Sequence, residues 1–195
     1  MENKIKNRLY FYYKKYFGRY FRYSSYPYFT GDTLRNYSQH IYDEISSINP
    51  NKVKSRDKVF VKGDYLNSFF NEIHPFIKNK YILFSHNSDE VINAEYEPYI
   101  DGKIIHWFAQ NLIENFSDVV SLIPIGLENR WYLKNGKLSP IRKTKKINQE
   151  KDLYILSLFN SGTNPERKLI NHALENNSLV VMPNTKNKLD YLSYI

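Results

Sequence analysis

The feature that most constrains this chain is a series of short, almost entirely apolar runs separated by polar stretches. Four of them occupy residues 59–61, 81–84, 104–108 and 119–125. Runs this short and this apolar are typical of strands buried on both faces, as in a parallel sheet covered by helices. The sequence therefore predicts an α/β domain: a Rossmann-like parallel sheet with helices on both faces.

Two helices are expected around these strands. Asp32 opens the first, which should run to about Ser46 with Leu34, Ile41 and Ile45 on its apolar side. The second is expected between the first two runs, over residues 65–76.

A second, shorter unit follows a polar and basic stretch. Apolar runs at 153–159 and 179–182 predict two strands, with one helix beginning at Pro165 and another expected over 186–195. Two strands make too small a sheet to be covered on both faces, so we expect an incomplete domain. The predicted organisation is a basic aromatic leader at 1–30, a first Rossmann-like domain at 31–135, a linker at 136–151 and a partial second Rossmann-like domain at 152–195.

Composition and charge narrow the function classes. The absence of cysteine excludes disulfides and thiolate metal sites. The net charge of +8 is concentrated in the leader and the linker rather than on the predicted folded body, so we expect no specific nucleic-acid partner. No apolar run approaches the ~20 residues that span a bilayer. Basic residues interrupt the N-terminal segment where a signal peptide would be apolar, so we expect a cytoplasmic protein.

Residues 4–23 combine Tyr and Phe with Lys and Arg, and the rings recur at roughly helical spacing. One interpretation is an interfacial helix that contacts an anionic membrane peripherally, with aromatic rings at the depth of the headgroups. The other is a surface helix that packs its rings on the domain, or a frayed leader.

Polar side chains follow three of the predicted strands, where open parallel sheets bind their ligands. These residues are His86, Asn87, Asp89, Asn111, Glu128 and Asn129. His86, Asp89 and Glu128 are candidate catalytic residues, one of which would act as general base for a sugar hydroxyl. The three asparagines are candidate substrate-binding residues. The alternative is that these side chains cap helices and shape turns.

The loop at 160–168 follows a predicted strand and opens a helix. Backbone N–H groups, the helix dipole and Arg167 would suit a phosphate or diphosphate there. The loop is neither a dinucleotide-binding glycine motif nor a P-loop. The alternative is a polar loop with Asn164 as helix cap. The five histidines have no metal-ligand spacing, so no metal site is predicted.

In combination, the motifs HNSD (86–89), WFAQN (107–111), PIGLEN (124–129) and TNPER (163–167) resemble exostosin-like glycosyltransferases. The similarity is greatest to the bacterial, viral and ribitol-xylosyltransferase-like branch, and extends from about residue 30 to the end.

This resemblance implies a GT-B architecture, in which the first domain holds a glycan or glycolipid acceptor and the second a nucleotide-sugar donor, with no metal cofactor. Asn160, Thr163, Asn164 and Arg167 would then contact the donor phosphates. The later donor-domain strands of the family are absent here, so this chain is expected to be truncated at the C-terminus. The rival functions are an inactive remnant or glycan-binding module of the same fold and, more distantly, a basic protein associated with nucleic acid.

Overall fold

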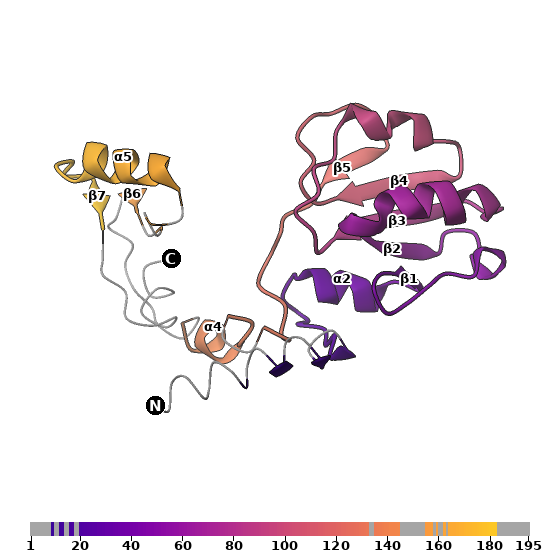
Figure 1. The fold of residues 1–195 in the computed structure, drawn as a ribbon, viewed down its shortest axis with the longest axis horizontal. Coiled ribbons are helices and arrows are strands. Elements are labelled where there is room, and N and C mark those ends of the chain that lie inside the picture. Colours follow the sequence, from indigo (N-terminus) through magenta and orange to yellow (C-terminus); the bar gives the residue numbers. More distant parts are fainter. Residues whose placement is uncertain are drawn as a thin grey trace. The chain divides into compact units, whose positions relative to one another are not determined.

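The structure is a computed structural model that describes residues 9, 12, 13, 16, 17, 20–132, 135–144, 155–157, 159, 162 and 164–182 (Figure 1). The chain divides into two compact units, Met1–Gly136 and Lys137–Ile195. No helix within the described residues has both the length and the apolar character needed to cross a bilayer.

The first unit is built on a five-stranded sheet in which all neighbouring strands are parallel. The strands are β1 (His40–Tyr42), β2 (Lys58–Lys62), β3 (Tyr81–His86), β4 (Ile104–Ala109) and β5 (Val120–Leu122). The four predicted apolar runs coincide with β2 to β5, which confirms the predicted parallel α/β sheet. The fold is consistent with the Rossmann-like class.

The prediction of one helix from Asp32 to about Ser46 is wrong. Helix α2 (Gly31–Tyr37) ends nine residues earlier, and β1 occupies the second half of the expected helix. The Ser38 hydroxyl donates to the Leu34 carbonyl at the end of α2, and such bonds compete with helical ones. Ile41 then pairs with Phe60 of β2, a contact that local periodicity does not reveal.

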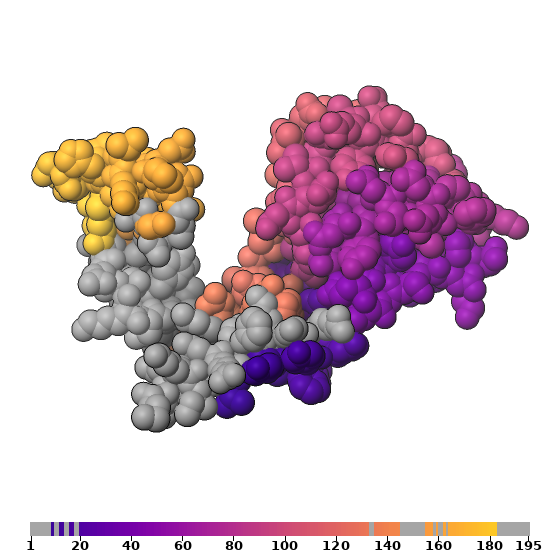
Figure 2. All heavy atoms as spheres, viewed as in Figure 1, coloured from indigo at the N-terminus to yellow at the C-terminus, as the bar shows by residue number. Residues whose placement is uncertain are grey.

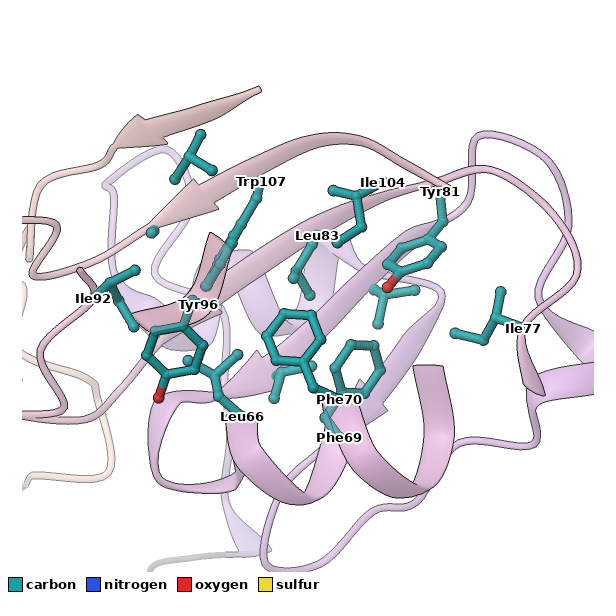
Figure 3. Packing of buried hydrophobic residues seen from close by; sticks show 14 of the residues in the cluster. Leu66, Phe69, Phe70, Ile77, Tyr81, Leu83, Ile92, Tyr96, Ile104 and Trp107 are labelled. Atoms are coloured by element: carbon teal, nitrogen blue, oxygen red, sulfur yellow. The ribbon is translucent and has the colours of Figure 1, made fainter. Parts of the chain in front are cut away.

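One face of the sheet carries the larger apolar cluster, shown in Figure 3. Trp107, Tyr81 and Leu83 project from the strands and are fully buried against Phe69 and Phe70. The last two belong to the predicted helical stretch, which consists of η3 (Gly63–Tyr65), α3 (Leu66–Ser68), the π-helical turn η4 (Phe69–Ile73) and η5 (His74–Phe76).

All four connections between strands contribute to this larger cluster. The connections include η2 (Pro50–Lys52) and η6 (Ala94–Tyr99), and their contributing residues include Ile48, Val53, Leu66, Ile77, Ile92, Tyr96 and Phe116. The strand order is simply sequential, β1-β2-β3-β4-β5. It therefore differs from a doubly wound sheet, whose order reverses in the middle.

The opposite face carries a smaller cluster in which Leu34 of α2 packs on Phe60 and Phe84. Phe29, before α2, and Ile123, after β5, complete it. The segments that precede β1 and follow β5 therefore cover this face, so helices lie on both faces as predicted. They also bring α2 to the carboxyl edge of the strands.

The second unit is described in part. It contains α4 (Ser139–Thr144), α5 (Pro165–Leu174) and a parallel pair formed by β6 (Ile155–Leu156) and β7 (Val180–Val181). Helix α5 begins at Pro165 as predicted, whereas α4 is a helix inside the predicted linker. The helix expected over 186–195 lies outside the described residues.

Candidate functional site

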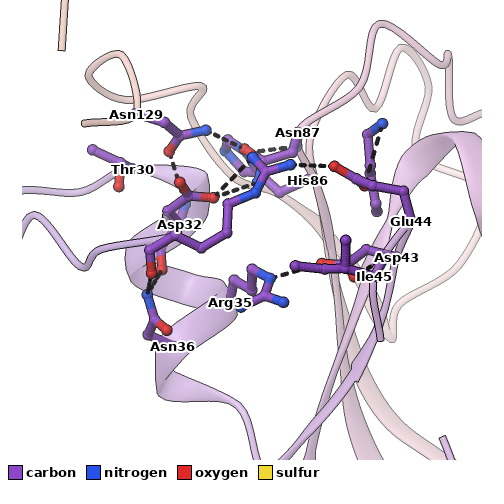
Figure 4. Close-up of polar contacts among 12 residues, drawn as sticks. Thr30, Asp32, Arg35, Asn36, Asp43, Glu44, Ile45, His86, Asn87 and Asn129 are labelled. Carbon is purple, nitrogen blue, oxygen red and sulfur yellow. Dashed lines mark hydrogen bonds and ion pairs between the residues drawn. The ribbon is translucent and has the colours of Figure 1, made fainter. Parts of the chain in front are cut away.

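Three residues from distant parts of the sequence close a ring of hydrogen bonds at the carboxyl edge of the sheet (Figure 4). The Asp32 backbone N–H donates to Oδ1 of Asn129 over 2.8 Å. The Asn129 amide donates to Oδ1 of Asn87 over 2.8 Å, and the Asn87 amide donates to Oδ1 of Asp32 over 3.1 Å. The ring therefore fixes the first turn of α2, the residue after β3 and the segment after β5 to one another.

Gly31 permits this close approach. A Cβ at this position would lie 1.8 Å from Oδ1 of Asn87 and 2.4 Å from Nδ1 of His86. Both distances are far below van der Waals contact, so any other residue would push α2 away from the end of β3. Asn87 itself has a φ of 63°, in the left-handed region that Asn tolerates better than most residues.

His86 is buried and uses both ring nitrogens. The Asn87 backbone N–H lies 2.8 Å from Nδ1, so Nδ1 is the acceptor and we assign the ring proton to Nε2. Nε2 then donates to the Pro124 carbonyl over 3.2 Å. Burial lowers the pKa of His86 below its ordinary value and so favours the neutral ring. His86 thus ties the segment after β5 to the sheet.

Asp32 is a buried acid whose charge is incompletely compensated. Its side chain is fully buried, and its Oδ2 atom accepts no hydrogen bond. Burial raises the pKa of Asp32 to about 6, although the charge of Arg22 and the hydrogen bond from Asn87 act in the opposite direction. The guanidinium of Arg22 lies 3.6 Å from Oδ1.

A chain of ion pairs crosses the carboxyl ends of β1, β2 and β3. Arg22 pairs closely with Glu44, which follows β1. Lys62, at the end of β2, lies 3.6 Å from Glu44 and 2.6 Å from Asp64. The Ser88 hydroxyl donates to Asp64 over 2.6 Å. Burial alone would lower the pKa of Lys62, but its bond to Asp64 and the charge of Glu44 outweigh burial and raise it.

A cavity of about 500 Å³ opens at this edge of the first unit. Its lining residues are Arg22, Gly31, Glu44, Lys62, Asp64, His86, Asn87, Ser88, Asp89, Gln110, Ile125, Gly126, Leu127, Glu128, Asn129, Trp131 and Tyr132. The structure therefore brings together five of the six residues predicted from the strand ends. Asp89 and Glu128 are the exposed carboxylates among those five.

The sixth predicted residue, Asn111, does not line the cavity. Its amide donates to the carbonyls of Ser88 and Glu90 over 3.0 and 3.3 Å, and its φ is 58°. Asn111 thus shapes the loop that carries Asp89, which is the turn-forming alternative for this residue.

The predicted phosphate-binding loop belongs to the second unit. Asn164 caps α5, because its side chain accepts the Glu166 N–H over 2.9 Å. The Arg167 guanidinium lies 5.7 Å from the centre of the Phe159 ring. Asn160 and Thr163 lie outside the described residues.

Sequence reasoning missed four charged residues of the cavity wall and the buried acid Asp32 behind it; the four are Arg22, Glu44, Lys62 and Asp64. The sequence pattern places Arg22 in the leader and Asp32 at the start of a helix. Lys62 and Asp64 directly follow an apolar run, so the rule that identified His86 and Asp89 would have found them too. Glu44 could not be found this way, because β1 was not predicted.

Among the described residues, no three His, Asp or Glu side chains converge in a way that could hold a metal ion. No protein-family model matches the chain, and no curated protein matches it either.

Proposed function

We propose that the cavity of the first unit binds a sugar acceptor, and that the chain is a glycosyltransferase-like protein. It would transfer a sugar from a nucleotide-sugar donor to a glycan or glycolipid. The observation that carries this proposal is the position and chemistry of the cavity. It lies at the carboxyl edge of a parallel sheet, and its wall combines amides, carboxylates and an indole ring.

This combination suits hydroxyl-rich ligands. Sugar hydroxyls both donate and accept hydrogen bonds, carboxylates accept them, and amides do both. Trp131, whose ring centre lies 3.9 Å from that of Tyr132 with the two planes tilted by 39°, adds apolar surface on which the CH groups of a sugar ring can pack. The carboxylates of the wall outnumber its two cations, Arg22 and Lys62. That balance favours a neutral sugar over a phosphate in this cavity.

Glu128 and Asp89 are the better candidates for the general base, because both are exposed carboxylates of the cavity wall. The base would take the proton of an acceptor hydroxyl while the hydroxyl oxygen attacks the anomeric carbon of the donor. The bond from that carbon to the diphosphate oxygen breaks, and the nucleoside diphosphate leaves with the electron pair. His86 would act as a positioning residue, since both ring nitrogens are engaged.

The departing diphosphate would be stabilised by the second unit. The N-terminus of α5 carries the positive end of the helix dipole, and Arg167 lies in its first turn, an arrangement that attracts anions. Asn160, Thr163 and Asn164 belong to the same loop. The two units would then correspond to the acceptor and donor sides of a GT-B enzyme, as the motif resemblance to exostosin-like glycosyltransferases implies.

A glycan-binding module without catalysis is the second candidate. The described residues that line the cavity all belong to the first unit, and they already supply the carboxylates and amides that would bind a sugar.

Calorimetry on the full chain with a panel of neutral oligosaccharides tests acceptor binding. Saturable binding that weakens at least about tenfold in Glu128→Gln or Asp89→Asn supports the proposal. Glu97→Gln is the matched control, because Glu97 is exposed and does not line the cavity. Binding that is absent from the whole panel, or that all three variants reduce equally, would exclude the cavity as an acceptor site.

Titration with nucleoside diphosphates separates the two candidates. Binding that Arg167→Ala abolishes, together with donor-dependent sugar transfer, identifies a transferase. Sugar binding without any diphosphate binding identifies the module.

A further inference from the structure

We infer that the described leader residues up to Tyr26 form a membrane-contact surface for an anionic lipid bilayer. This inference does not depend on the proposed function. It begins from the aromatic side chains that this segment exposes; Figure 2 shows the described atoms of the segment in indigo. The large exposed apolar side chains of the segment are Leu9, Tyr12, Tyr16, Phe17, Tyr20, Phe21, Tyr23 and Tyr26.

The exposed fractions of these rings are higher than those of partly buried core residues. Phe17 is 59% exposed, Tyr20 57% and Tyr26 80%. Neither apolar cluster of the first unit includes a described residue between 9 and 26, whereas Phe29, nearer the end of the leader, packs in the smaller cluster. These exposed fractions do not favour the interpretation in which Phe17 and Tyr26 pack on the domain.

The rings also share a helical arrangement. Tyr12, Tyr13 and Tyr16 are helical, and the Phe17 N–H donates to the Tyr13 carbonyl over 2.9 Å. Tyr12 stacks on Tyr16 with ring centres 6.1 Å apart, as expected of neighbours four residues apart on one helix face. Aromatic rings gathered on one side of a short helix suit the headgroup region of a bilayer, which accepts an apolar ring with a polar tip.

The charge of the segment selects an anionic bilayer. Apart from Arg22, which pairs with acids of the first unit, residues 1–23 contain six basic residues against the single acid Glu2. Basic residues beside an interfacial aromatic face attract anionic lipids, and a neutral bilayer would offer them no partner.

Arg22 attaches this segment to the folded unit. Its side chain turns inward to Asp32 and Glu44 and lies over the Trp131 ring at 4.8 Å. Asn36 donates to the Arg22 carbonyl over 2.7 Å. The leader is thus fixed at its carboxyl end, while Phe21 and Tyr23 on either side of Arg22 remain exposed.

Single-stranded nucleic acid is the other partner that basic and aromatic residues attract, through stacking of bases on rings. The leader is less suited to it. Phe21 stacks between Tyr13 and Tyr23 at 6.2 and 6.0 Å, with the three planes nearly parallel. A base would have to displace one ring to reach another.

Sedimentation of the full chain with vesicles tests the inference. We expect binding to phosphatidylglycerol–phosphatidylcholine vesicles, weakened at least about tenfold in a Tyr16→Ser, Phe17→Ser, Tyr20→Ser triple variant. The control triple variant Tyr37→Ser, Phe76→Ser, Ile113→Ser removes three side chains that are equally exposed elsewhere, and should bind like the wild type. Far-UV circular dichroism verifies that both variants are folded.

A Phe17→Trp variant adds a direct reading of depth, because an indole entering the headgroup region shifts its emission to the blue. Three results would each overturn the inference. They are equal sedimentation of the two triple variants, equal binding to pure phosphatidylcholine vesicles, and tighter retention on single-stranded RNA than on anionic vesicles.

Discussion

The two units of this chain use the same sequence pattern of short apolar strands and helices, yet only one of them has a core among its described residues. The first unit places five strands side by side and buries Trp107, Phe70 and Leu83 completely or nearly so. In the second, β6 and β7 pair, but α5 has no buried residue and Leu169 is 71% exposed. A strand–helix–strand segment thus acquires a core only when further strands and connections cover its faces.

The largest expected effect is on the core of the first unit. Trp107→Ala should cost about 3–5 kcal/mol of unfolding free energy, because it removes a fully buried ring from the larger cluster. It also removes the indole N–H that donates to the Ser85 hydroxyl over 2.8 Å. Urea unfolding of the full chain, followed by circular dichroism, measures this cost. A cost below about 1 kcal/mol would mean that the first unit is packed no better than the second.

The next effect concerns the buried acid. Between its ordinary pKa of 3.8 and its folded value of about 6, Asp32 holds a proton in the folded state that the unfolded state has released. The contribution of Asp32 to the free energy of unfolding therefore falls as the pH rises from 3.8 to about 6, and it stays constant above that range. At about 1.4 kcal/mol per pKa unit, the loss amounts to about 3 kcal/mol.

Asp32→Asn should remove this loss of about 3 kcal/mol, while the weakened contact with Arg22 costs about 1 kcal/mol. The variant should therefore have a free energy of unfolding about 2 kcal/mol higher than that of the wild type above pH 6. The lowered pKa of His86 has the opposite effect, because it makes the free energy of unfolding decrease as the pH falls. It is present in both proteins, so the difference between their unfolding curves isolates Asp32. Curves that run parallel from pH 4 to pH 8 would contradict the prediction.

A smaller effect is expected where α2 meets β3. Gly31→Ala should cost about 1–3 kcal/mol, because the added Cβ collides with Asn87 and His86. It should also shift the side-chain amide signals of Asn87 and Asn129 in NMR spectra, since the hydrogen-bonded ring must open. The matched control is Gly102→Ala, where a Cβ meets nothing within 4 Å. Equal costs for the two substitutions would show that the ring tolerates displacement.

The smallest effect is expected in the second unit. Leu169→Ala should change the unfolding free energy by less than about 0.5 kcal/mol, because the side chain is exposed on α5. Hydrogen exchange should likewise find the amides of α5 less protected than those of β3. A cost near that of Trp107→Ala would mean that α5 is buried in solution.

The sequence predicts what local patterns determine. The runs that became β2 to β5 are recognisable because every residue in a two-face-buried strand is selected for burial. Strand β1 could not be predicted, because it forms through pairing with β2 and because Ile41 fits a helical period equally well. The site divides in the same way. His86 ends β3 and Asn129 follows β5, whereas Arg22 and Glu44 reach the cavity through contacts between segments 22 residues apart.

The sequential strand order has a topological consequence. Since all connections lie on one face, the other is sealed by the two ends of the first unit. The Leu127 backbone N–H donates to the Phe29 carbonyl over 2.9 Å, and the Arg130 guanidinium donates to the Ser24 carbonyl over 3.3 Å. The segment before α2 and the segment after β5 are therefore hydrogen-bonded to each other. Such closure comes late in synthesis, because its partners are about a hundred residues apart. It also makes the unit suited to circular permutation: a short peptide joining the two ends, with new termini opened at Gly102, would preserve every strand neighbour.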